Sequence, residues 1–412
     1  MLRNKMARAA KAAVTLLVIA GACLASVGQT LAAPPSNDPA LAAEYAATWS
    51  ARLVNAQGFV PLPDTSPNIT ATLETALALG AARVEKPTFD RIVNWLAAHI
   101  ETAIVDGGND DPGNIGEMLM IAGLAGLNPS DVAGVNLVDR LSNTLGDLVP
   151  GLFGAQDPSY DGVYRQALAL VGLGAVGSTV PPEAVAWLAS QQCSGSPAAA
   201  AGGWQAYRAN LALPCDAPDP VNFVGPDTNS TALAVQALVA SGARSAVPSA
   251  LSFLAAAESG AGGFAFISGL ADDPNSTSLV IQAILAAGED PRSGRWVASA
   301  GDPMTSLLSW QLGCAATEGD RGAFASPFSS GAPDAFATRQ AVWGAAMRPF
   351  PLATGTFHPA ALPCQSTTTT TAPTTTRMAS TTSSAPLGAS PSTTTVEVSA
   401  AGAVVAVPRF TG

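Results

Sequence analysis

Residues 227–242 read DTNSTALAVQALVASG, and residues 273–288 read DPNSTSLVIQAILAAG. Each stretch opens with an Asp and small polar residues, continues as an alanine-rich apolar helix, and ends in Gly. The two final glycines, Gly242 and Gly288, are 46 residues apart. Self-similarity with a period of roughly 20 to 50 residues is the signature of a repeat architecture.

The repeat extends on both sides of this pair. Equivalent helix ends lie at Gly80, Gly126, Gly172, Gly242, Gly288 and Ala346, and an aromatic residue or Leu marks a preceding helix at Trp49, Trp95, Leu141, Trp187, Phe253 and Trp310. The first helix of each pair has a polar side, which predicts an outer position, whereas the second is apolar on nearly every side, which predicts an inner one. Each Gly is the expected helix stop. The sequence therefore predicts six helix pairs between about Pro39 and Phe350.

Six pairs can form an open solenoid or close on themselves. An open solenoid needs polar caps at its ends, but the first and last inner helices, at Thr70–Leu79 and Phe336–Ala346, are as apolar as the middle ones. The predicted fold class is therefore all-α, a closed six-by-six (α/α)6 toroid of six helix pairs.

Gly-aromatic turns between the helices carry a specific resemblance. They are Gln57-Gly58-Phe59, Gly202-Gly203-Trp204, Gly262-Gly263-Phe264 and Gly322-Ala323-Phe324. With Gln57, Gln191 or Gln192 upstream, they resemble degenerate QxxxGxW repeats of the terpenoid cyclase and protein prenyltransferase superfamily. The resemblance covers residues 39–350. It includes the prenyltransferase and squalene oxidase-like repeats and, distantly, the helical barrel of the cobalamin carriers. It implies an α/α toroid.

Composition limits the partners. The chain has 412 residues, of which 48% are hydrophobic and 12% are charged. Four of its 19 basic residues lie in the first 11 positions, so 15 basic residues face 30 acidic ones in the rest. An acidic surface repels phosphate backbones, which disfavours nucleic acid. Only His99 and His358 are present, which disfavours His-based metal sites and a Ser/His/Asp triad.

The N-terminal segment, residues 1–33, has the layout of a cleaved export signal: basic residues, an apolar run from Ala12 to Leu24, then small residues. That run is too short for a bilayer span. A lipoprotein signal using Cys23 is the alternative. Nothing after residue 33 is apolar enough to span, so the mature chain is expected to be secreted.

Two further regions follow the signal. Residues 36–364 are assigned to the toroid. Residues 365–412 are rich in Ser, Thr and Pro, a composition typical of a disordered stalk. The final residues from Pro408 to Gly412 faintly resemble a truncated cell-wall sorting signal, so attachment to a wall and chance likeness both stay open.

Four cysteines remain in the mature chain. Cys193 and Cys215 bracket one insertion, in QQC...ALPC, and Cys314 and Cys364 bracket the last repeat, in QLGC...ALPC. This parallel favours disulfides within each pair, each worth about 3 to 4 kcal/mol in the chain-entropy model. Zinc is the weaker alternative because no CxxC spacing occurs.

Two recurring polar levels are the candidate ligand-binding positions. Counting back 15 residues from the helix ends gives a ring of carboxylates at helix N-termini, namely Asp111, Asp157, Asp227 and Asp273, with Asp64 and Asp334 near the same level. Counting back six residues from the same helix ends gives a second level, formed by Glu74, Met120, Gln166, Gln236, Gln282 and Gln340. Alternatively, the residues of the first set cap the helices, and those of the second set form hydrogen bonds between helices. Arg165 and Arg339 either face each other or pair with Glu74 or Glu117.

Catalytic motifs of the resembled families are missing. No Asp-x-Asp-Asp acid occurs, since Asp106-Gly-Gly-Asn-Asp-Asp111 and Asp272-Asp273 fall in loops, and no zinc set for prenyl transfer is apparent. No metal, cofactor or catalytic residue is therefore expected. The one inner-helix pair of glutamates that suits glycan cleavage is Glu74 with Glu117.

The sequence favours a non-catalytic, exported module that is held at the cell surface. Its partner would be a small molecule, a cell-wall glycan or an extracellular protein, and a terpenoid cyclase-like or glycan-cleaving enzyme is the alternative. Turn aromatics are additional candidate ligand contacts: Phe59, Trp204, Tyr207, Phe264, Phe266 and Phe324. The alternative is that they fill the junctions between repeats.

Overall fold

A computed structural model of the chain describes residues 36–146, 149–154, 161–195, 197–208, 210 and 212–364. The predicted signal at 1–33, the predicted stalk at 365–412 and Asp157 lie outside the described residues. No helix in the described part has the length and apolarity that a bilayer span requires.

The described chain is rich in helix, as predicted. Its α-helices are α1 (Pro39–Ala51), α2 (Ile69–Ala82), α3 (Lys86–Ala98), α4 (Ile100–Ile104), α5 (Pro112–Ala125), α6 (Leu137–Ser142), α7 (Val163–Ala175), α8 (Pro182–Ser190), α9 (Thr228–Ala240), α10 (Val247–Ala257), α11 (Pro274–Ala287), α12 (Pro303–Ser309) and α13 (Ala335–Ala345). Short 3-10 helices occupy Ala198–Ala200, Arg244–Ala246 and Gly294–Trp296. Two antiparallel strand pairs join β1 (Val105–Asp106) to β2 (Asn109–Asp110) and β3 (Trp204–Gln205) to β4 (Pro226–Asp227).

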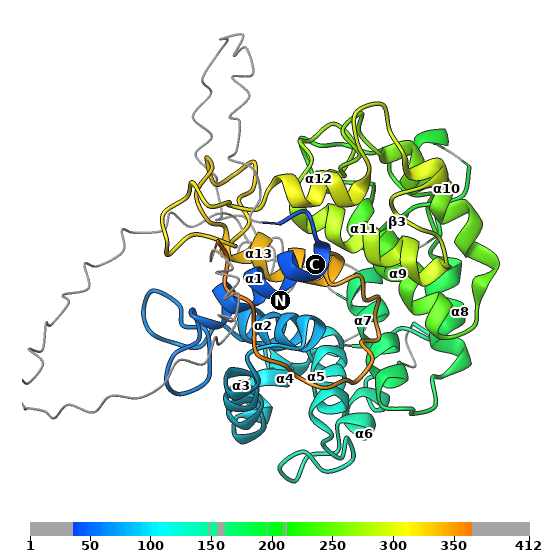
Figure 1. The fold of residues 1–412 in the computed structure, drawn as a ribbon. Helices are drawn as coiled ribbons and strands as arrows, with labels where there is room; N and C mark the ends of the chain where they lie inside the picture. Colours follow the sequence, from blue (N-terminus) through cyan, green and yellow to red (C-terminus); the bar gives the residue numbers. More distant parts are fainter. Residues whose placement is uncertain are drawn as a thin grey trace, which may run out of the picture. The chain divides into compact units, whose positions relative to one another are not determined.

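The six predicted inner helices contact one another in succession. Helix α2 packs on α5, α5 on α7, α7 on α9, α9 on α11, α11 on α13, and α13 returns to α2 (Figure 1). They are buried almost throughout: in α2, every residue from Ala71 to Ala82 is buried. A helix that is apolar on all sides needs neighbours on all sides, and this cycle of contacts supplies them.

The remaining longer helices lie against pairs of inner helices. Helix α3 contacts α2 and α5, α8 contacts α7 and α9, α10 contacts α9 and α11, and α12 contacts α11 and α13. Their amphipathic character matches this position: in α3, Phe89, Ile92 and Leu96 are buried, whereas Asn94 is exposed. Helix α1 contacts both α2 and α13, so it links the first pair to the last.

Turn glycines bring each outer helix close to the next one. The residue pairs are Gly58 with Arg91, Gly151 with Glu183, Gly202 with Ser249, Gly262 with Asp302 and Gly322 with Tyr45. All five glycines have a positive φ, which glycine adopts without strain. A Cβ at Gly58 would lie 2.4 Å from the Arg91 carbonyl oxygen. These turns therefore require glycine for both backbone geometry and space.

Two glutamines strengthen these turns in the same way. The Gln192 side-chain amide donates to the carbonyl oxygens of Gly202 and Ala246, and that of Gln311 donates to those of Gly322 and Ala42. Gln192 thus ties one turn to the following helix α10. Gln311 ties the last turn to α1, the first helix of the described chain.

The predicted glycine stops are only partly correct. Gly126 and Gly288 cap α5 and α11 with left-handed backbone. Gly80 and Gly172 instead lie inside α2 and α7, which continue for two or three more residues. Their role is packing, since a Cβ at Gly172 would lie 2.5 Å from the backbone oxygen of Gly116 in α5.

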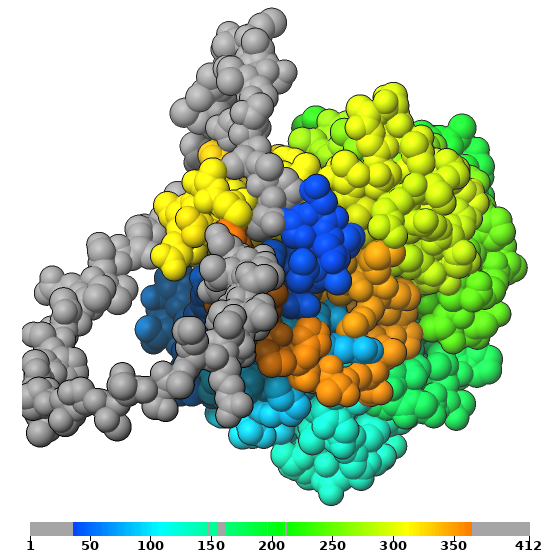
Figure 2. Space-filling view, in the orientation of Figure 1, coloured from blue at the N-terminus to red at the C-terminus, as the bar shows by residue number. Residues whose placement is uncertain are grey.

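Both predicted disulfides are confirmed. Cys193 is bonded to Cys215 and Cys314 to Cys364, with Cα–Cα separations of 5.6 and 5.5 Å. The second bond fastens the segment 347–364, which we call the C-terminal strap. Figure 2 shows this part of the chain, in orange, on the surface between the blue N-terminal part and the green central part.

The strap crosses the C-terminal ends of several inner helices. Gln282 of α11 donates to the carbonyl oxygen of Arg348, and Gln236 of α9 accepts from the backbone N–H of Phe350. Further along, the Arg83 side chain donates to the carbonyl oxygens of residues 353 and 354. Phe357 then packs on Phe89 of α3, with 5.0 Å between ring centroids. The strap thus covers the end of the inner helices opposite to their capped N-termini.

The close contact between α5 and α7 generates a matched test. Gly172→Ala should destabilise the fold by about 1 to 3 kcal/mol, since its new methyl group would meet the backbone of Gly116. Gly174→Ala, two residues further along the same helix, finds its nearest atom 4.0 Å away and should gain up to about 1 kcal/mol from helix propensity. Urea denaturation measures both. Equal effects of the two substitutions would contradict the packing described.

Candidate functional site

The predicted carboxylates at the inner-helix N-termini act as helix caps. Asp111 accepts from the backbone N–H groups of Gly113 and Asn114, Asp227 from that of Ser230, and Asp273 from that of Ser276. Asp334 caps α13 in the same manner. Asp64 accepts from Ser66 in a loop, and Asn68 caps α2 instead. The recurrence of Asp therefore follows from the repeated need for a cap.

Asp111, Asp227 and Asp273 are all buried, and for two of them burial raises the pKa. Burial raises the pKa of Asp227 to about 7 and that of Asp273 to about 6, against the hydrogen bonds that lower them. Asp111 differs from both because it also holds an arginine, described below.

The predicted glutamine level does not line a common surface, because its side chains bond to other elements. Gln166 donates to the carbonyl oxygens of Gly151 and Ala184. Gln236 and Gln282 hold the strap, and Gln340 donates to Glu74. The side chains of Gln166, Gln236 and Gln282 therefore form hydrogen bonds between elements of the fold, which explains them better than contact with a ligand.

The turn aromatics are mostly core residues. Trp204, Phe264 and Phe324 have no exposed surface, and Phe59 is 7% exposed. The Trp204 indole N–H donates to the carbonyl oxygen of Leu188. These side chains fill the junctions between repeats, and their burial removes Trp204 and Phe264 as ligand contacts. Tyr207 is the exception, because it reaches charged residues of the inner helices.

Charged and phenolic side chains gather in the first turns of the inner helices. We call this set the inner polar cluster; it consists of Glu74, Asp111, Glu117, Tyr164, Arg165, Tyr207 and Arg339. The two arginines do not behave alike: Arg339 pairs with Glu74, as one of the expectations had it, whereas Arg165 pairs with Asp111 and not with Glu74 or Glu117.

The first ion pair joins the sixth repeat to the first. Arg339 Nε of α13 lies 3.1 Å from Glu74 Oε2 of α2, and both side chains are less than 10% exposed. Gln340 donates to the other Glu74 oxygen at 2.7 Å, and Asn275 donates to Gln340 at 3.2 Å. Burial raises the pKa of Glu74, and the Arg339 charge opposes that rise. Both oxygens of Glu74 are thus bonded.

The second ion pair lies between α5 and α7. Arg165 Nε donates to Asp111 Oδ2 at 2.9 Å, and Arg165 NH1 donates to the Tyr207 hydroxyl oxygen at 2.8 Å. Burial raises the pKa of Tyr207, while the Arg165 charge opposes the rise. Asp111 therefore serves as a helix cap and as the partner of a buried guanidinium.

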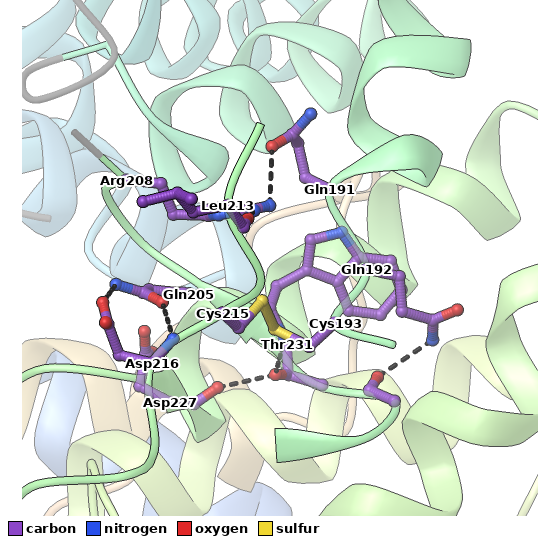
Figure 3. Close-up of a disulfide and its surroundings, with 12 residues drawn as sticks. Gln191, Gln192, Cys193, Gln205, Arg208, Leu213, Cys215, Asp216, Asp227 and Thr231 are labelled. Atoms are coloured by element: carbon purple, nitrogen blue, oxygen red, sulfur yellow. Dashed lines mark hydrogen bonds between the residues drawn. A yellow bond between two sulfur atoms is a disulfide. The ribbon is translucent and has the colours of Figure 1, made fainter. Parts of the chain in front are cut away.

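Tyr207 belongs to an insertion that the Cys193–Cys215 disulfide closes (Figure 3). Within it, Gln205 donates to the Asp216 carboxylate at 2.7 Å and accepts from the Asp216 backbone N–H at 3.0 Å. The insertion is also anchored to α9, since Thr231 accepts from the backbone N–H of Trp204. The disulfide thus helps to hold Tyr207 against Arg165.

Glu117 of α5 is the exception within the cluster. Its side chain is 7% exposed, and no hydrogen bond or ion pair reaches its carboxyl group from any residue that the structure describes. Burial raises the pKa of Glu117 well above its ordinary value, and the nearby charges of Glu74 and Asp111 raise it further. Glu117 is therefore a buried acid whose surroundings favour its protonated form.

Partly exposed residues lie beside this acid. Tyr164, at the second position of α7, keeps some accessible surface although burial raises its pKa well above 10; the Glu74 and Glu117 charges add to that rise. Asn114 lies one helical turn before Glu117 on the same side of α5 and is also partly exposed. Tyr164 and Asn114 are therefore the partly exposed polar side chains beside the buried acid.

This arrangement suits proton donation and hydrogen bonding more than metal binding. In the described ranges, no three or more His, Cys, Asp or Glu side chains are grouped to hold a metal ion. Buried polar groups normally find partners, and a strongly perturbed acid beside charged neighbours is a candidate functional group.

Comparison with known proteins supports the fold. No family model matches the chain, and no curated protein matches it. Among solved structures, a UGL variant with the saccharide dGlcA-Glc-Rha-Glc has a TM-score of 0.50 and 13% identity, over 75% of this chain and 95% of that one. The chain shares the α/α toroid fold with that protein.

Two other structures are similar at slightly lower scores. Unsaturated glucuronyl hydrolase from Bacillus sp. GL1 has a TM-score of 0.48 and 13% identity, over 75% of this chain and 94% of that one. The type II terpene cyclase MstE from Scytonema has a TM-score of 0.49 and 13% identity, over 76% of this chain and 98% of that one. At these identities, the likeness concerns the fold alone.

Sequence reasoning found some members of the cluster and missed others. It singled out Glu74 with Glu117 as the inner-helix pair of glutamates, and it left the partners of Arg165 and Arg339 open. Tyr164 was missed, because it lies two residues before Gln166, at a level that Ala234 and Val280 occupy in the two following repeats. The repeat register therefore gives no signal for it.

The unpaired acid generates a prediction on stability. Because the pKa of Glu117 is raised in the folded state, its folded form binds a proton that the unfolded chain releases above about pH 4.3. The free energy of unfolding therefore falls with pH by about 1.4 kcal/mol per pH unit between the two pKa values. Glu117→Gln removes this loss, so the variant should exceed the wild type in stability by more at pH 8 than at pH 5.

Chemical denaturation across pH measures this difference. Glu183→Gln, an exposed glutamate of α8, is the matched control and should follow the wild type at every pH. A gap between Glu117→Gln and wild type that stays constant with pH would show that Glu117 titrates normally.

Proposed function

We propose that this protein is an exported α/α toroid that binds a hydroxyl-rich ligand, a glycan, at the inner polar cluster. The observation that carries the proposal is Glu117, a buried carboxyl group without a partner in the described chain. A ligand whose hydroxyl groups bond to Glu117 would supply the hydrogen bonds that the described chain does not.

The chemistry of the surroundings favours a sugar over a hydrocarbon. Tyr164, Tyr207 and Asn114 provide hydroxyl and amide groups close to the three carboxyl groups. An isoprenoid chain would leave these polar groups without hydrogen bonds, and sites with unpaired buried polar groups reject apolar ligands strongly. We therefore do not propose isoprenoid cyclisation or transfer.

The proposed fold is the closed six-by-six toroid. It is supported by the contact of α13 with α2, by the bond from Gln311 to Ala42, and by the close approach of Gly322 to Tyr45. Each of these joins the sixth helix pair to the first.

Removal of the sixth pair tests closure. A chain that ends at Gly301 should aggregate, because the apolar faces of α2 and α11 would lose α13. A chain that ends at Ser366 should remain monomeric. Size-exclusion chromatography distinguishes the two results. A monomeric chain ending at Gly301, with an unchanged melting temperature, would support an open solenoid instead.

Export and attachment to the cell surface remain part of the proposal. They rest on the leader at residues 1–33 and the Thr-rich segment after Cys364, together with two disulfides, which persist in oxidising compartments.

The binding proposal has a direct test. Purified protein is titrated calorimetrically with trimers of glucose, N-acetylglucosamine and glucosamine. At least one should bind, and Glu117→Leu should weaken that binding about tenfold or more, since it removes a hydrogen-bonding group worth about 1.5 kcal/mol. Glu183→Gln should bind like the wild type. Unchanged affinity in Glu117→Leu would place the ligand elsewhere.

Glycan cleavage is the second candidate function, and one observation favours it. The pKa of Glu117 is raised with no cation to oppose the rise, whereas Glu74 lies against a guanidinium that opposes the rise in its pKa. Two carboxyl groups whose surroundings differ in this way suit a general acid and its charged companion. If products form, Glu117→Gln should abolish them, while a protein that only binds would retain its ligand with this variant.

A further inference from the structure

The inner polar cluster lacks one positive charge. It contains three carboxyl groups, those of Glu74, Asp111 and Glu117, and two guanidinium groups. Arg339 lies on Glu74, and Arg165 lies on Asp111. The Glu117 side chain is only 7% exposed, and no arginine or lysine side chain pairs with it among the described residues. Among these three described carboxyl groups, Glu117 is the one without a guanidinium beside it. Asp227, whose charge also acts on Tyr164 and Tyr207, caps α9 and has no ion pair in the described chain.

We propose that the ligand supplies the missing cation: the bound glycan carries a protonated amine, as an amino sugar does, and its ammonium group pairs with Glu117. The inference rests on the proposed function and names the substrate class of the same site. An ammonium group is compact and donates three hydrogen bonds, so it can satisfy a carboxylate and neutral oxygens together.

The same arrangement disfavours an acidic sugar. A ligand carboxylate entering the cluster would meet Glu117 and the two ion-paired carboxylates, while both arginines are already occupied. Releasing Arg165 would also strip Asp111 and Tyr207 of their shared partner. A neutral sugar meets no such conflict, but it leaves Glu117 protonated. The expected order of affinity is therefore cationic, then neutral, then acidic.

Binding of an ammonium group would change the proton content of the site. The titratable groups that act on Glu117 are Glu74 of α2 and Asp111 at the start of α5, and the Glu117 charge in turn acts on Tyr164 of α7. Glu74 already pairs with Arg339 and Asp111 with Arg165, and the pKa of Tyr164 is raised. The proton released when a cation binds therefore comes from Glu117, whose O–H bond breaks as the proton passes to the buffer.

Calorimetry with three trimers tests the inference at about pH 6.5, where an amine of ordinary pKa is protonated. The probes are the trimers of glucosamine, N-acetylglucosamine and galacturonic acid. Wild-type protein should bind the glucosamine trimer at least tenfold more tightly than the acetylated one and release close to one proton, measured by comparing buffers of different ionisation enthalpy.

Variants separate the outcomes. Glu117→Gln keeps the shape of the protonated acid, so it should still bind the acetylated trimer but lose both the preference and the proton release; Glu183→Gln should keep both. Equal affinity of wild type for the amine and acetylated trimers, or a preference that survives in Glu117→Gln, would overturn this inference and leave glycan binding intact. Binding of none of the trimers would overturn the proposed function and this inference with it.

Discussion

The described fold depends on how the sixth helix pair meets the first. Gln311 and Gly322 place the last turn against α1 with the same contacts that Gln192 and Gly202 make with α10. The last junction is thus built like an internal one, although its partners are about 270 residues apart in the chain. Because the inner helices are apolar throughout, α13 and α2 both need this junction to remain buried.

The candidate site is a consequence of the same junction. The contact of α13 with α2 brings Arg339 to Glu74, and the disulfide-closed insertion brings Tyr207 to Arg165. Both guanidinium groups are thereby used, and Glu117 is left as a buried acid between two ion pairs. Breaking a buried ion pair is costly because it leaves a buried charge without a partner. Arg339 and Arg165 are therefore expected to stay with Glu74 and Asp111, which leaves Glu117 without an ion pair.

Features that repeat along the chain could be predicted from the sequence, whereas features that depend on contact between distant residues could not. Local composition predicts the helix pairs and the capping by Asp227 and Asp273. The similar sequence segments around the two cysteine pairs predict both disulfides. The partner of Arg165 lies 54 residues away, and nothing local chooses Asp111 over Glu117. The sequence wrongly predicts a helix stop at Gly172. Its actual role, the close contact with Gly116, depends on the packing of α5 on α7, which the local sequence does not specify.

The protonation state of Glu117 tests the account most directly. Carbon-13 NMR of protein labelled at glutamate carboxyl carbons, with the resonance assigned by its loss in Glu117→Gln, reports its titration. The account predicts that the Glu117 resonance keeps the chemical shift of a protonated acid through neutral pH and moves to the ionised shift when the glucosamine trimer binds. Titration at the pKa of an exposed glutamate, unaffected by the trimer, would contradict it.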